Sequence, residues 1–214
     1  NMKVQNVVYN PQTDNTPGKY DHQTRIVDGN SQCGYAMFAH VAQPLFPEMA
    51  SDLNVAKYVA DLENDQPGSI GMRVRALVYN PNPAVFIPRL GAQIDAHSNA
   101  LRLKLADAGR TDIDVVQHTG VGTPEDIIKA LEGGSPVGCM AVFKVAGFGL
   151  VYHFETIVGY EKDASGNLSW IMYDSYGNFY PQWNPASYGK GADILYPEPW
   201  FRQQCGGYGY IWYW

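Results

Sequence analysis

Three residues far apart in the sequence carry side chains that together could perform acyl transfer. Cys33 follows a polar loop, and the small and apolar residues after it recur at helical spacing. This places the thiol in the first turn of a helix, where the helix dipole and unpaired backbone N–H groups favour thiolate over thiol. A thiolate is a nucleophile, but acyl transfer also needs a base and a group that holds the base. His153 and Asp174 are the candidates for these two tasks.

The elements that must position these side chains differ between the two halves of the chain. In the first half, proline and glycine breaks separate stretches with apolar residues on one face, which predicts helices. These helices are expected over residues 33–43, 47–64 and 91–108. Residues 3–9 alternate loosely, as an edge strand does, and residues 68–90 fit a helix or a strand equally.

The second half predicts an antiparallel sheet with one helix. Thr123, Pro124 and the acidic residues after them form a helix start, with threonine at the N-cap and proline at the first position. Strands are expected over residues 112–118, 136–145, 150–160, 167–174 and 208–214. His153 then lies on one strand and Asp174 ends the next, and the turn at residues 162–167 has about the length that brings both to one sheet edge. Helices followed by an antiparallel sheet indicate an α+β fold.

The composition argues against several functional classes. The chain has 214 residues, 45% of them hydrophobic, which is enough for a substantial core. A net charge of −6 with only 17% charged residues argues against a nucleic-acid surface. No apolar run is long enough to span a membrane. No signal peptide is visible at Asn1, so the N-terminus does not reveal the localisation.

The three cysteines differ in their surroundings. Cys139 lies in an apolar run that predicts a buried strand, and Cys205 lies in a segment expected to be a loop. A disulfide between Cys139 and Cys205 is a minor alternative to a core thiol. No pair of cysteines or histidines has the short spacing of zinc ligands, so neither a metal nor an organic cofactor is expected.

Three segments resemble a known family, the papain-like cysteine peptidases. Cys33-Gly34-Tyr35-Ala36-Met37 resembles their nucleophile helix. Residues 131–137 and 152–160 resemble the run of helix, strand and histidine strand, and residues 170–177 resemble the strand that ends in the orienting Asp or Asn. The likeness is nearest to the bacterial branch of bacteriocin-leader peptidases and staphopain-like enzymes. It covers residues 31–43 and 123–178, about half of the chain.

The resemblance implies a single papain-like catalytic domain over residues 1–214. Its expected parts are an N-terminal arm at residues 1–30, a mainly helical lobe at 31–110 that carries the cysteine, and a mainly β lobe at 111–214 that carries the histidine and the aspartate. His153 would take the proton of Cys33 and later protonate the leaving group. Asp174 would hold the imidazole and stabilise its charged form, so a thiolate–imidazolium pair is the expected resting state.

The chain departs from the family where the oxyanion donor is expected. These peptidases place a glutamine several residues before the nucleophile, but the sixth residue before Cys33 is Val27. The substitutes close by in the sequence are Gln32, Gln23 and Asn30, which would act together with the backbone N–H of Cys33. This departure leaves open an unusual branch, such as a bacterial toxin or effector, or a site without activity.

Each site residue alone also has a plain structural interpretation. A cysteine before a helix is more often a core residue, a histidine in a sheet is often only a hydrogen-bonded histidine, and Asp174 could be a turn carboxylate. His22, His40, His97 and His118 show no partner pattern, and His40 is expected to pack or to face solvent.

The function expected from the residues and the resemblance is hydrolysis of a peptide or isopeptide bond through a Cys-His-Asp triad and a thioester intermediate. A deamidase, amidase or acyltransferase with the same triad is one alternative. A papain-like module that binds a peptide without cutting it is another, and the missing glutamine favours it. The expected partner is a peptide or protein substrate outside the bacterial cell, neither nucleic acid nor membrane, and the oligomeric state is left open.

Overall fold

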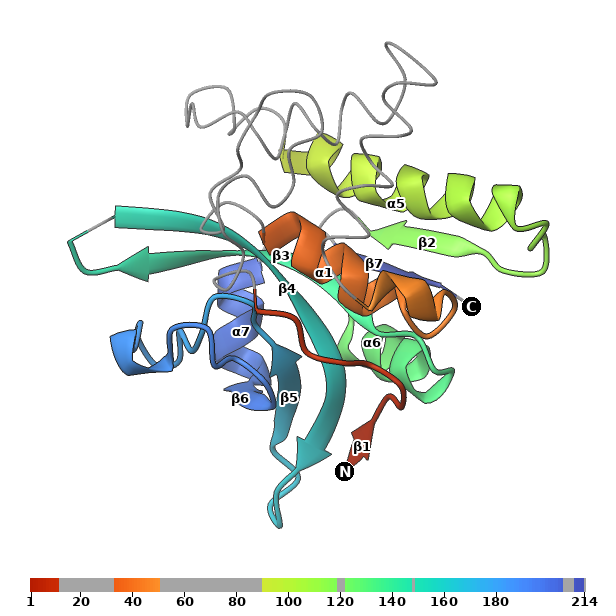
Figure 1. The fold of residues 1–214 in the computed structure, drawn as a ribbon. Coiled ribbons are helices and arrows are strands. Elements are labelled where there is room, and N and C mark those ends of the chain that lie inside the picture. Colours follow the sequence, from red (N-terminus) through yellow and green to blue (C-terminus); the bar gives the residue numbers. More distant parts are fainter. Residues whose placement is uncertain (12–32, 51–89, 119–121, 148, 206–209, 214) are drawn as a thin grey trace.

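A curved antiparallel sheet forms the centre of the protein, which is an α+β structure (Figure 1). The computed structural model describes residues 1–11, 33–50, 90–118, 122–147, 149–205 and 210–213. The strands are β1 (Met2–Lys3), β2 (Val115–His118), β3 (Val137–Val145), β4 (Gly149–Lys162), β5 (Leu168–Tyr173), β6 (Ile194–Pro197) and β7 (Tyr210–Tyr213). The helices are α1 (Cys33–Ala42), α5 (Leu90–Asp107), α6 (Pro124–Glu132) and α7 (Glu198–Cys205), with short 3-10 turns η3 (Pro47–Met49) and η5 (Pro185–Ser187).

The strand order is β2-β7-β3-β4-β5-β6, and β1 pairs separately with β4. β4 is the longest strand and pairs with β3 from Gly149 to Ile157, but it pairs with β5 only from Thr156 to Lys162. The part of β4 that carries His153 therefore extends past the end of β5. Asp174 is the first residue after β5, at the end where β4 continues alone. The unequal strand lengths therefore bring Asp174 close to His153.

Helices cover both faces of the sheet. α1 packs on one face, against β3 and β4, and α7 packs on the opposite face (Figure 1). Gly138 of β3 permits the close approach of α1, because a Cβ atom there would lie 2.8 Å from the sulfur of Met37. The face toward α6 and α7 holds a large core, with Trp170, Tyr196, Phe201, Ile127 and Leu131 almost fully buried.

The N-terminal segment crosses the sheet as an extended chain, below α1 in the view of Figure 1. Met2 and Lys3 pair with Tyr160 and Gly159, and the N–H of Val4 donates to the carbonyl of Val158 at 2.8 Å. A Cβ atom on Gly159 would lie 2.2 Å from the carbonyl oxygen of Met2. The glycine in β4 is thus what allows β1 to lie so close.

Most of the predicted elements are confirmed where the structure describes them. The helix predicted at residues 33–43 is α1, and the one predicted at residues 91–108 is α5. Thr123 caps α6 by accepting from the N–H of Asp126 at 3.2 Å. The strands predicted at residues 112–118, 136–145, 150–160 and 167–174 are β2, β3, β4 and β5.

Other predictions need correction. Of the predicted edge strand at residues 3–9, only Lys3 belongs to a strand, the two-residue β1. The predicted helix at 47–64 begins with a 3-10 turn at Pro47–Met49, and residues 51–64 lie outside the described residues, as does the ambiguous segment 68–89. The loop expected around Cys205 is wrong, because this residue ends α7. The strand predicted at residues 208–214 is described only at Tyr210–Tyr213, as β7, which lies inside the sheet between β2 and β3.

Among the helices that the structure describes, none is long and apolar enough to cross a membrane.

We expect Gly159→Ala to lower the free energy of unfolding by about 2 to 3 kcal/mol, because the new methyl group would collide with the backbone of β1. Gly138→Ala is the matched control in the neighbouring strand, where the colliding atoms belong to the side chains of Met37 and Val41 and can move. It should cost about 1 kcal/mol. Urea denaturation measures both values, and equal losses would contradict the account of β1.

Candidate active site

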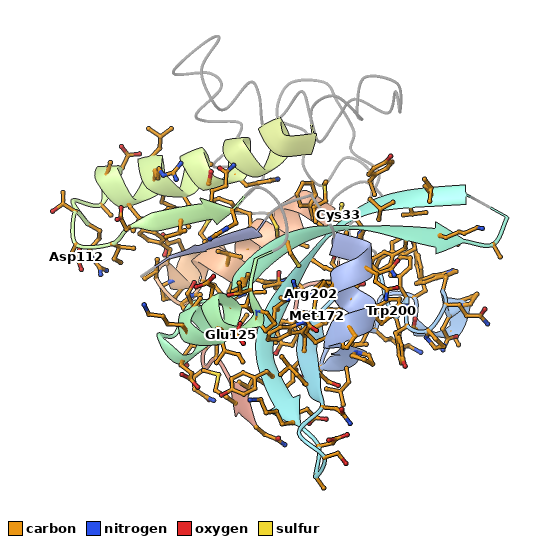
Figure 2. The ribbon with its side chains drawn as sticks, turned by 180° about the vertical axis from the view of Figure 1, so that it is seen from behind. Cys33, Asp112, Glu125, Met172, Trp200 and Arg202 are labelled. Carbon is orange, nitrogen blue, oxygen red and sulfur yellow. The ribbon has the colours of Figure 1, made fainter. Side chains whose placement is uncertain are left out.

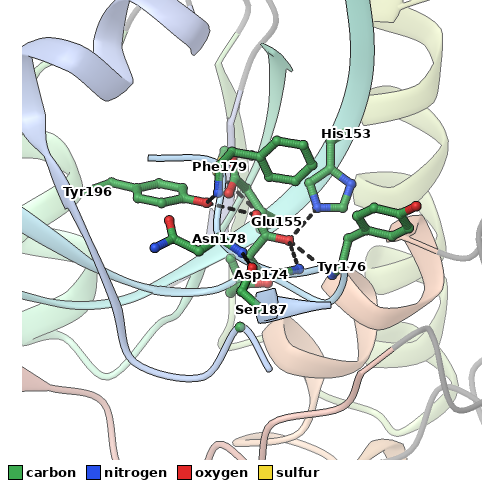
Figure 3. A network of polar contacts seen from close by, with 12 residues as sticks. His153, Glu155, Asp174, Tyr176, Asn178, Phe179, Ser187 and Tyr196 are labelled. Atoms are coloured by element: carbon green, nitrogen blue, oxygen red, sulfur yellow. Dashed lines mark hydrogen bonds and ion pairs between the residues drawn. The ribbon is translucent and has the colours of Figure 1, made fainter. Parts of the chain in front are cut away.

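His153 and Asp174 form a buried hydrogen-bonded pair. Nε2 of His153 donates to Oδ1 of Asp174 at 2.7 Å, and the two residues are 4% and 0% exposed (Figure 3). An N–O distance of this length is typical of a charge-assisted hydrogen bond. The sequence-predicted base and its predicted partner are therefore in direct contact.

Four donors surround the carboxylate of Asp174. Besides His153, the backbone N–H groups of Tyr176 and Gly177 donate to Oδ1, at 3.0 and 3.2 Å. The hydroxyl of Tyr196 donates to Oδ2 at 3.0 Å, and it accepts from the N–H of Phe179 at 2.9 Å. Because every one of these groups donates, the site suits an ionised carboxylate, which is acceptor-only.

The turn that aims backbone N–H groups at the carboxylate depends on Gly177. Its φ angle is 144°, a region that L side chains rarely adopt, and a Cβ atom there would lie 2.7 Å from the carbonyl oxygen of Ser187. A carboxylate that accepts backbone N–H bonds from the residues just after it is a common turn arrangement. The N–H groups of the turn thus replace part of the water that would otherwise stabilise the negative charge of Asp174.

Cys33 is the first residue of α1 and is partly exposed. Figure 2 shows it at the end of the helix, beside the long β3–β4 hairpin. It lies close enough to the ring of His153 to raise the pKa of that ring. Since Nε2 of His153 is engaged with Asp174, Nδ1 is the ring nitrogen available to exchange a proton with the thiol. The structure brings together all three residues that the sequence singled out.

The pKa of His153 is raised well above its ordinary value of 6.5. Burial favours the neutral ring and lowers the pKa, but the charge of Asp174 and its hydrogen bond outweigh burial, and the contact with Cys33 adds to them. The ring therefore carries a positive charge near neutral pH, next to a sulfur atom at the N-terminal end of a helix.

Two further buried histidines behave in the opposite way. Burial lowers the pKa of His40 to about 3 and that of His97 to about 4. Nε2 of His40 accepts from the N–H of Asn10 at 2.9 Å, so Nδ1 carries the proton and donates to Thr156 at 3.2 Å. His40 thus packs inside the protein as a neutral ring.

His97 packs against the first turn of α1, at Gly34. A Cβ atom on Gly34 would lie 2.9 Å from Nε2 of His97 and 3.6 Å from the ring of Phe154. The residue after Cys33 is therefore a glycine because the first turn of α1 leaves no room for a side chain.

Aromatic rings enclose the His–Asp pair on one side. The ring of Phe179 lies 5.4 Å from that of His153, and the rings of Phe143 and Tyr176 each lie 6.3 Å away. Trp183 packs on Phe179 and Tyr176 at 4.8 and 5.0 Å. An apolar surrounding strengthens the attraction between the two charged groups, because little water is present to screen it.

The sequence did not indicate some of the site residues, and others cannot be placed. Tyr196 was missed, because nothing in its neighbourhood marks one tyrosine among 15. The oxyanion candidates Gln32, Gln23 and Asn30 lie outside the described residues. Cys139 is buried in β3 as a thiol whose sulfur donates to the carbonyl of Glu155 at 3.4 Å, so the alternative disulfide to Cys205 is wrong. Within the described part of the chain, no group of three His, Cys, Asp or Glu side chains could hold a metal ion.

No protein-family model matches this chain, and no curated protein matches it. The likeness to papain-like peptidases therefore depends on the three sequence motifs.

We expect His40, His97 and His153 to separate in an NMR titration of their ring protons. His153 should keep its second proton at neutral pH, whereas His40 and His97 should stay neutral until the pH falls below about 5. Because the folded pKa of His153 lies above its unfolded value, its contribution to stability is full below pH 6.5 and is lost as the pH rises through the folded value. In Asp174→Asn the His153 signal should titrate at lower pH, and an unchanged value would contradict the assigned cause.

We expect Tyr196→Phe to lower the free energy of unfolding by about 2 to 4 kcal/mol, because it leaves Oδ2 of Asp174 and the N–H of Phe179 without the hydroxyl that both use. Tyr180→Phe removes a hydroxyl from the same aromatic cluster and is the control, with an expected cost of about 0.5 kcal/mol or less. Thermal or urea unfolding gives both values. A loss in Tyr196→Phe no larger than in the control would show that the hydroxyl does not hold the carboxylate.

Proposed function

We propose that this protein is a papain-like cysteine hydrolase that cleaves a peptide or isopeptide bond. The observation that carries the proposal is that His153 is hydrogen-bonded to the buried carboxylate of Asp174 while Cys33 lies close enough to raise the pKa of the same ring. A cysteine at a helix start, a histidine with a raised pKa and an orienting carboxylate are the parts that thiol acyl transfer needs. In this view α1 belongs to the lobe with the nucleophile, and the sheet belongs to the lobe with the base.

The first half of the reaction forms a thioester. The thiolate of Cys33 adds to the carbonyl carbon of the scissile bond, and the carbonyl oxygen takes up the negative charge. The imidazolium of His153 then gives its Nδ1 proton to the leaving nitrogen, and the C–N bond breaks as the carbonyl re-forms. The first product leaves as an amine, and the acyl group stays on sulfur.

The second half returns the enzyme to its starting state. Neutral His153 removes a proton from water, and the oxygen of that water adds to the thioester carbon. The C–S bond breaks, which yields the acid product, the thiolate and the imidazolium. Asp174 stays ionised throughout and keeps Nε2 of His153 in place, so that Nδ1 always faces the reacting atoms.

The developing oxyanion needs donors near Cys33. The backbone N–H of Cys33 is one candidate, because the first N–H groups of a helix have no acceptor within the helix. Gln32, Gln23 and Asn30 remain the side-chain candidates for the second donor. The helix dipole of α1 adds to the stabilisation of negative charge at this end.

We expect iodoacetamide to label Cys33 selectively at about pH 6, where an ordinary thiol is almost wholly protonated. His153→Ala should slow this labelling by about 100-fold, because the thiolate loses its imidazolium partner. Peptide mapping by mass spectrometry identifies the modified cysteine and gives its rate. Equal, slow labelling of all three cysteines would contradict the proposal and favour a binding module.

The reaction class can be tested directly with a library of proteome-derived peptides. The wild-type protein should create new peptide amine termini, and Cys33→Ala, which lacks the nucleophile, should create none. The same mass spectra report the mass change of glutamine or asparagine deamidation. Deamidation without new termini would replace the peptidase with a deamidase that uses the same triad.

A further inference from the structure

β5 ends at Tyr173, so Asp174 is the first residue after the strand. The last rung between β4 and β5 joins Thr156 and Tyr173, and the ladder between β5 and β6 ends at Met172. The backbone of Asp174 therefore lies past the sheet, and its N–H and C=O groups need other partners. The N–H donates to the carbonyl of Gly191, at 2.9 Å.

The carbonyl of Asp174 is bound by a residue from the other end of the chain. The hydroxyl of Tyr9 donates to this carbonyl at 2.9 Å and accepts from the N–H of Gly191, also at 2.9 Å. In a regular antiparallel pair the N–H of Gly191 would donate directly to the carbonyl of Asp174. Here the hydroxyl of Tyr9 lies between these two groups and binds both. The approach is so close that a Cβ atom on Gly191 would lie 1.8 Å from the Asp174 carbonyl oxygen.

Tyr9 is itself held by α1, the helix that begins at the nucleophile. Gln43, just after α1, binds both backbone groups of Val8, at 2.7 and 3.0 Å. His40 of α1 accepts from the N–H of Asn10 at 2.9 Å, and its ring stacks on that of Tyr9 with centroids 6.0 Å apart. The residues on either side of Tyr9 are thus fixed to the element that carries Cys33.

We propose that Tyr9 is a positioning residue for Asp174, an inference that rests on the proposed function. The carboxylate reaches His153 over 2.7 Å only if the backbone at position 174 stays in place, and the sheet does not hold that backbone. Tyr9 supplies the missing bond. A shift of about 1 Å would take the carboxylate out of hydrogen-bonding range of the imidazole, and the thiolate–imidazolium pair would lose its support.

The alternative is that Tyr9 only fastens the N-terminal segment to the sheet. Tyr173 offers a matched control, because its hydroxyl donates to the carbonyl of Val7 at 3.2 Å and so fastens the same segment. Each tyrosine-to-phenylalanine variant keeps the ring and removes one hydroxyl. Only Tyr9→Phe removes a bond to the backbone of Asp174.

The test is the rate at which iodoacetamide alkylates Cys33 in the full chain, at two pH values. At about pH 6 the thiolate depends on charged His153, whereas at about pH 10 an unassisted thiol is ionised anyway. We expect Tyr9→Phe to slow the reaction about three- to tenfold at the lower pH and to leave it unchanged at the higher pH, because the variant loses the hydroxyl that joins the carbonyl of Asp174 to the N–H of Gly191. Tyr173→Phe should match the wild type at both. Melting temperatures of the variants show that each is folded.

Suppose that Cys33 of the wild-type protein reacts far faster than free cysteine at the lower pH. A Tyr9→Phe variant that reacts equally fast would then overturn the inference and leave the proposed function standing. Equal slowing in Tyr9→Phe and Tyr173→Phe would also overturn it, because the segment would then act only as a fastening. A wild-type Cys33 that reacts no faster than free cysteine would overturn the proposed function, and the inference with it.

Discussion

The rest of the site depends on one buried negative charge, the carboxylate of Asp174. A fully buried carboxylate is costly unless the protein replaces the water it has lost. Here the replacement comes from His153, from Tyr196 and from two backbone N–H groups of the following turn. These donors hold the carboxylate in its ionised form, and the ionised form is what keeps a proton on His153. The sheet and the aromatic cluster exclude water from this carboxylate, and the turn supplies hydrogen bonds to it.

The unequal lengths of β4 and β5 decide where this charge lies. β4 continues past the end of β5, so His153 stands on the part of the strand that β5 does not cover. Asp174 comes one residue too late to belong to the ladder, which frees its side chain and its backbone for other partners. A carboxylate inside the regular sheet would alternate with its neighbours and could not gather donors from the turn. The same freedom leaves its backbone to be held by Gly191 and Tyr9.

Cys33, His153 and Asp174 could be found from the sequence because each is marked by its local pattern: a polar loop before an apolar helix, an alternating strand, and a strand that ends in Asp-Ser-Tyr-Gly. The cap at Thr123 was readable for the same reason. Tyr196 and Tyr9 were not, because they act over 22 and 165 residues and their own surroundings carry no sign of it. The place of β7 between β2 and β3 is likewise a matter of distant pairing. Local patterns reveal the residues with reactive side chains, whereas the residues that hold them in place depend on the tertiary fold.

His40, His97 and His153 show that contact with Asp174, more than burial, decides the charge of a buried ring in the described part of the chain. All three rings are removed from water, and burial alone lowers the pKa of His97 to about 4. His40 feels the charge of Asp174 from a distance, yet its pKa still falls to about 3. Only His153 has the carboxylate at 2.7 Å, and only there does the balance reverse. Coulomb attraction overcomes desolvation only at short range and with good hydrogen-bond geometry. A small movement of Asp174 would therefore return His153 to the neutral state of its neighbours, and this is why the groups that fix the backbone of Asp174 matter as much as those that bind its side chain.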